Sequence, residues 1–83
     1  MPIERVPLRD AARDVPAAVR TEGVARPERQ LPIRAWIVDG KGRDLEVDGV
    51  AVAWTSRAVN VRYLDSGGRE GFVWVWASAV SRK

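Results

Sequence analysis

From residue 33 onward, apolar and polar side chains alternate in short runs that turn residues separate. The clearest run is 58–64, in which Val59, Val61 and Tyr63 alternate with polar residues. A period of two places successive side chains on opposite faces of a strand. We therefore predict a strand over Ala58 to Leu64, with these three apolar side chains facing inward.

Turn residues mark where the other predicted strands end. Asp-Gly pairs begin at residues 39 and 48, and the run Asp65-Ser66-Gly67-Gly68 predicts a tight hairpin. The residues from Ala77 to Val80 suit a single 3₁₀ turn. The remaining predicted strands are 33–38, 45–47, 50–54 and 70–76, with 81–83 as a last edge strand. Short strands at this spacing, joined by hairpins, favour a small barrel.

The segment 71–80 holds three of the six aromatic residues of the chain. Phe72, Trp74 and Trp76 are expected on one side of its strand, and Val73 and Val75 on the other. We predict that the two valines, with Val80, face the core. Because a small barrel buries only one face fully, the aromatic face either binds a partner or is covered by another part of the chain.

Two tryptophans lie outside that segment. The chain has few large aliphatic residues, so tryptophan is needed for core volume. We therefore expect Trp36 and Trp54 to fill the core.

Residues 1–32 differ from the rest because they carry all five prolines and no aromatic residue. Proline at this spacing excludes a long helix or a central strand. Two short helical turns are predicted, one lined by Leu8 and Val15 and one that Pro16 opens and Gly23 ends. We predict a flexible arm over 1–32, in front of a barrel over 33–83. A disordered leader, a segment docked on the barrel and a recognition peptide that folds on a partner are the alternatives.

Composition excludes several kinds of chemistry. The 83 residues suffice for one small domain and include no cysteine and no histidine. The chain therefore offers no disulfide, no thiolate zinc site and no histidine to activate a serine. We expect no cofactor, no metal, no small-molecule substrate and no enzymatic activity.

The sequence also bears on location. The first residues lack the apolar core of a signal peptide, and the longest apolar stretch falls far short of the ~18–20 residues of a membrane span. We expect a cytoplasmic protein that does not contact a membrane.

Asp44, Glu46 and Asp48 alternate along one stretch of the chain. Carboxylates at this spacing can ligate a metal, but they more often form an exposed edge that discourages aggregation, and we adopt the second interpretation. Together with Asp39 they form an acidic cluster that suits an arginine-bearing protein partner.

The last part of the chain resembles a known family. The run Gly68-Arg69-Glu70-Gly71, the strand 72–76 and the turn 77–80 resemble the end of a Src-homology-3-like (SH3-like) barrel. Residues 44–47 are similar to the acidic loop and strand near the start of that family, and 59–65 to the central strand of Tudor-like barrels. The resemblance implies a mainly β fold, a small five-stranded SH3-like barrel with one 3₁₀ turn. Where the family groove has proline and tyrosine, this chain has Trp76 and Ala79, so we do not expect it to bind proline-rich peptides.

Charge and aromatic residues together predict the function. The net charge is +3, and the chain from Trp54 onward has five basic residues and two acidic ones. Arginine interleaved with aromatic rings is typical of surfaces on which bases stack. We predict a binding module for nucleic acid or a nucleoprotein complex. The candidate binding residues are Phe72, Trp74, Trp76, Arg57, Arg62, Arg69 and Arg82.

Two other interpretations of the aromatic face stay open. The same tryptophans can anchor a protein partner, which would make the chain an interaction module or a regulatory subunit that docks on a larger protein. They can also form an aromatic cage for a methylated cation.

Overall fold

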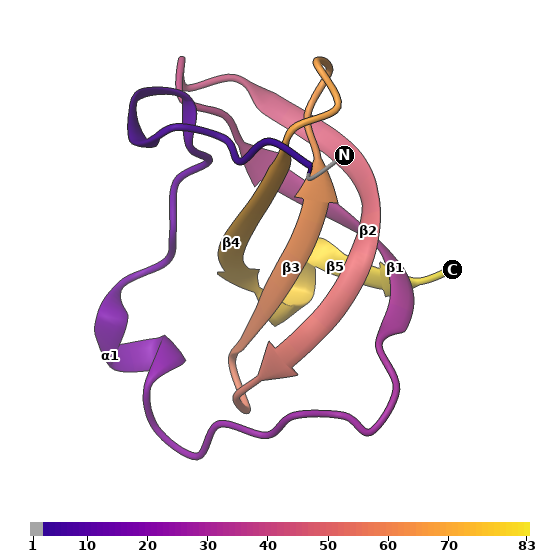
Figure 1. Cartoon of the computed structure of the whole chain (residues 1–83). Helices are drawn as coiled ribbons and strands as arrows, with labels where there is room; N and C mark the ends of the chain where they lie inside the picture. Colours follow the sequence, from indigo (N-terminus) through magenta and orange to yellow (C-terminus); the bar gives the residue numbers. More distant parts are fainter. Residues whose placement is uncertain (1–2) are drawn as a thin grey trace.

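The computed structural model describes residues 3–83, and the chain is mainly β (Figure 1). Five antiparallel strands form one sheet in the order β4-β3-β2-β1-β5. The strands are β1 (Leu31–Val38), β2 (Asp44–Trp54), β3 (Ala58–Leu64), β4 (Glu70–Trp76) and β5 (Val80–Arg82). The short helical elements are η1 (Leu8–Asp10), α1 (Ala17–Arg20) and η2 (Ala77–Ala79). Within residues 3–83 no ladder joins β4 to β5, so the sheet is unclosed.

Most of the predicted strands are confirmed. β3 and β4 have the predicted bounds, and η2 leads into β5 as expected. The turn predicted at Asp48-Gly49 is wrong, because β2 runs unbroken through it. Gly49 pairs with Ile33 in β1 and with Tyr63 in β3. A strand on each side therefore keeps this Asp-Gly pair extended, and tertiary context overrides the local turn preference.

The β1–β2 and β3–β4 hairpins have turns of the same kind. Each turn has the sequence pattern Asp-x-x-Gly-Arg, at 39–43 and at 65–69. In each, the aspartate accepts hydrogen bonds from two backbone N–H groups at 2.8–2.9 Å and from the arginine Nε at 2.7–3.0 Å. Gly42 and Gly68 take φ of +81° and +77°, which glycine adopts without steric cost. Both turns are therefore specified locally.

These turns make stability depend on pH. Hydrogen bonds, first of all from the backbone N–H of Arg43 and of Arg69, lower the pKa of Asp39 and Asp65. A carboxylate whose pKa is lowered on folding stabilises the fold above its unfolded pKa of ~3.9, and that stabilisation is lost as the pH falls through the folded pKa. We expect the free energy of unfolding, measured with urea, to decrease below about pH 4.

The matched variant carries Asp39→Asn and Asp65→Asn together. Because neither turn then holds a titrating carboxylate, its free energy of unfolding should decrease less steeply between about pH 4 and pH 2 than that of the parent. Identical slopes for the two proteins would show that the turn carboxylates do not stabilise the fold.

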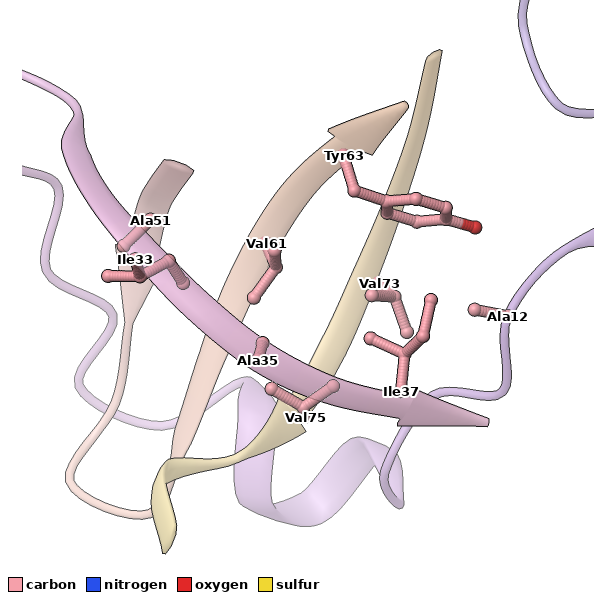
Figure 2. Packing of buried hydrophobic residues seen from close by; sticks show 9 residues of the cluster. All are labelled: Ala12, Ile33, Ala35, Ile37, Ala51, Val61, Tyr63, Val73 and Val75. Carbon is pink, nitrogen blue, oxygen red and sulfur yellow. The ribbon is translucent and has the colours of Figure 1, made fainter. Parts of the chain in front are cut away.

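The core lies on the inner face of the sheet (Figure 2). Its largest fully buried side chains are Ile33, Val61 and Val73. The other members of the cluster are Ala12, Ala35, Ile37, Ala51, Tyr63 and Val75. The predicted inward orientation of Val73 and Val75 is confirmed, and Val80 packs against the cluster half-buried. The same register turns the aromatic side chains of β4 outward.

The expectation for the two other tryptophans is half right. Trp54 is partly buried and packs against the core cluster. Trp36 does not fill the core, since 54% of it is exposed. Ile33, Ala35 and Ile37 face inward along β1, so alternation places Trp36 on the outer face.

Residues 4–6 of the arm lie at the free edge of β4, next to Glu70 (Figure 1). The N–H of Val6 donates to the carbonyl of Glu70 at 2.8 Å, and that of Val15 to the carbonyl of Trp74 at 3.0 Å. The Trp74 N–H donates in turn to the Asp14 carboxylate at 2.8 Å. The edge of β4, which would otherwise be open to other strands, is thus held at two places by the chain itself.

The arm also connects β4 to β1 and β2. The Arg13 N–H donates to the carbonyl of Val38 at the end of β1 at 2.8 Å, next to Ala12, which is buried in the core. Further on, Ala25 and Trp54 exchange two backbone hydrogen bonds at 2.7 and 2.9 Å. Of the two predicted helical turns, the first forms only as η1 and the second as α1 after Pro16.

Amide exchange tests how firmly the arm is held, and its flexibility stays a prediction until then. Because the amides of Arg13 and Val15 donate to strand carbonyls, we expect them to exchange slowly. The amides of Glu28 and Gln30 serve as the internal control, since both residues are exposed, and we expect them to exchange rapidly. Rapid exchange at all four positions would show that the arm is undocked in solution.

Candidate functional site

Four of the predicted binding residues lie together on the outer face of β3 and β4. Arg62 stands opposite Phe72 in the ladder, and Asn60 stands opposite Trp74. Phe72 and Trp76 are 42% and 41% exposed, whereas Trp74 is half-buried. We call Phe72, Trp74, Trp76 and Arg62 the aromatic face.

A guanidinium group lies over each of the two exposed rings. Arg57, from the turn between β2 and β3, stands 5.5 Å from the ring centroid of Trp76. Arg5, from the arm, stands 5.7 Å from that of Phe72. Both distances are within the ~6 Å reach of a cation–π interaction. Arg57 was predicted as a binding residue and Arg5 was not, because nothing in the sequence pattern of the arm brings it next to β4.

A shallow groove of about 360 Å³ continues the aromatic face toward the β3–β4 hairpin. Arg62 lines this groove and forms a partly buried ion pair with Glu70, at 3.6 Å between Nη1 and Oε2. The apolar residues that line the groove include Ile3, Val50 and Leu64. Because 40% of the Arg62 side chain stays exposed, its guanidinium can also contact an anion from solution.

Two predicted residues lie elsewhere. Arg69 belongs to the hairpin turn, where its Nε donates to Asp65 at 2.7 Å and its Nη2 to Asp10 at 3.3 Å. The hydrogen bond to Asp65 raises the pKa of Arg69, so its charge is fixed within the turn. Arg82 is on β5, where it pairs with Ile33 of β1 and with no residue of β4. The structure therefore does not bring either of them to the aromatic face.

The aromatic face is coupled to the arm through backbone and core. Trp74 holds the arm by both its N–H and its carbonyl. On the inner side of the same strands, Tyr63 packs over Gly71, and burial raises the pKa of its phenol. A hydrogen bond with the Ala12 backbone opposes that rise. The site is thus supported by a packed layer that includes the arm.

Residues 3–83 hold no group of three His, Cys, Asp or Glu side chains able to bind a metal ion. The same residues form no helix long and apolar enough to cross a membrane. Comparisons of the chain with protein-family models, with curated proteins and with solved structures returned no match.

Proposed function

We propose that this chain is a non-enzymatic module that binds single-stranded nucleic acid on the aromatic face. The observation that carries the proposal is the pair of exposed rings, Phe72 and Trp76, each with a guanidinium over it. Bases stack on aromatic rings whatever their sequence, and arginine both stacks and neutralises phosphate.

The arrangement supports a division of roles. Phe72 and Trp76 lie four residues apart on one face of β4, which is about 13 Å along a strand. Two bases can therefore stack at separate points once Arg5 and Arg57 turn from the rings to the phosphates. Arg5, Arg57 and Arg62 surround those points and supply the positive charge for the phosphates between them.

We further propose that the curled sheet and the docked arm together make an SH3-like barrel. The strand order supports this, because β5 returns to pair with β1 after the η2 turn. The arm supports it as well, because residues 13–15 donate both to β4 and to the end of β1. In such a barrel the aromatic face lies outside and is accessible.

A titration of fluorescein-labelled oligothymidylate with the chain, followed by anisotropy, tests the proposed function. Each phosphate contact on a single strand lowers the log of the affinity by ~0.7 per log unit of salt, so three arginine contacts predict a slope of about −2. The absence of binding at low salt, or binding with no salt dependence, would refute the proposal. A duplex of the same length serves as the control, since paired bases cannot stack on the rings.

A protein partner is the second candidate, and the groove beside the aromatic face favours it. Ile3 and Leu64 line that groove and are 59% and 56% exposed. If a second copy of the chain covers this groove, sedimentation velocity should show association that Leu64→Ser abolishes. A monomer at every concentration would exclude self-association through the groove.

A further inference from the structure

The most exposed aromatic side chain of the described residues is outside the aromatic face. Trp36 lies on the outer surface of β1, with 54% of it exposed. Its cross-strand partner on β2 is Glu46, and the diagonal positions on the same face belong to Asp44 and Asp48. We call Trp36, Arg34, Asp44, Glu46 and Asp48 the Trp36 face.

Trp36 differs from the other exposed rings in what stands over it. Phe72 and Trp76, although less exposed, each carry a guanidinium of this chain at 5.7 and 5.5 Å. Within residues 3–83 no cationic group stands over Trp36. The face of the Trp36 ring is therefore open, whereas an arginine of this chain covers the rings of Phe72 and Trp76.

The charges around Trp36 are mainly negative. Arg34 lies 3.8 Å from Glu46 and 3.1 Å from Asp48, and Lys83 lies 3.4 Å from Asp48. Asp44 forms no ion pair with any of the residues 3–83. Three carboxylates thus face two cations, which repels phosphate and attracts a further cation.

We propose that the Trp36 face binds an arginine side chain of a basic protein segment. The guanidinium stacks on the indole of Trp36, and its N–H groups donate to the carboxylates of Asp44 and Glu46. Arginine fits better than lysine because the face of its planar guanidinium can stack on a ring while the N–H groups at its edge donate hydrogen bonds. This surface is on β1 and β2 and does not include the rings of β4, although Asp48 also lines the groove beside Arg62.

The test uses the ¹⁵N-labelled full chain and the peptide Gly-Arg-Gly-Arg-Gly, with both ends blocked. We expect the indole N–H signal of Trp36 to shift saturably, and Trp36→Leu to weaken binding about two- to fivefold, as measured on the Glu46 amide signal. The same peptide with citrulline in place of arginine should produce no shift. The matched control is Trp76→Leu, whose ring already carries Arg57, and it should leave peptide binding unchanged.

Three results would overturn the proposal. The first is a Trp36 indole signal that the arginine peptide does not move. The second is an equal shift with the citrulline peptide, which would show that the charge is not recognised. The third is an equal loss of binding in Trp36→Leu and Trp76→Leu, which would place the peptide elsewhere. Since Trp36 is exposed, its replacement is not expected to unfold the chain, and circular dichroism verifies this.

Discussion

Replacing Gly71 with alanine is expected to lower the free energy of unfolding by about 3 kcal/mol. Gly71 is buried and stands opposite Tyr63 in the β3–β4 ladder. A Cβ atom at this position would lie 2.6 Å from Cζ and 2.7 Å from the hydroxyl oxygen of Tyr63. The Tyr63 ring is itself buried in the core cluster, so it cannot move aside without disturbing that packing (Figure 2).

Urea unfolding followed by tryptophan fluorescence measures this effect. The matched control is Gly67→Ala, since a Cβ there meets only the side chains of Asp65 and Arg69, at 3.4 and 3.9 Å. The free energy of unfolding of that variant should lie within about 0.5 kcal/mol of that of the parent. Equal stability of the Gly71→Ala variant and the parent would show that Tyr63 does not pack over Gly71.

Removing both exposed rings of the aromatic face is expected to weaken oligonucleotide binding at least about 30-fold. Each stacked base contributes ~1–3 kcal/mol, so Phe72→Leu and Trp76→Leu together remove at least about 2 kcal/mol. Both side chains are about four-tenths exposed and point away from the core, so leucine should preserve the fold. The anisotropy titration with oligothymidylate measures the loss.

The control for this prediction is Trp36→Leu. It also removes an exposed indole, but from β1, whose outer face carries carboxylates. Its affinity for oligothymidylate should match that of the parent. If Trp36→Leu and the double variant bound equally well, stacking on the aromatic face would not be the basis of binding.

The strands of this fold could be predicted wherever side-chain alternation matched one buried face. β3 and β4 were predicted with their bounds, because Val61, Tyr63, Val73 and Val75 alternate with outward residues. The same rule places Trp36 outside, since Ile33, Ala35 and Ile37 occupy the inward positions. The expectation that Trp36 fills the core was based on the volume of its side chain and did not take this alternation into account.

The docking of the arm could not be predicted in this way. Its contacts with β4 and β1 are made by backbone N–H and carbonyl groups, which every residue except proline offers. The position of Arg5 over Phe72 depends on that docking and is equally invisible in the sequence. Arg69 is a different case, because the repeated spacing Asp-x-x-Gly-Arg at 39–43 and 65–69 already indicates a structural role in the turn.

One spectrum tests the central claim, nucleic-acid binding on the aromatic face, most directly. The chain has four tryptophans, and the structure distributes their side chains over the aromatic face, the Trp36 face and the edge of the core. When oligothymidylate is added to the ¹⁵N-labelled chain, the indole N–H signals of Trp74 and Trp76 should shift, with the larger shift at Trp76. Those of Trp36 and Trp54 should stay in place. Unchanged signals at all four positions, or a shift confined to Trp36, would contradict the account.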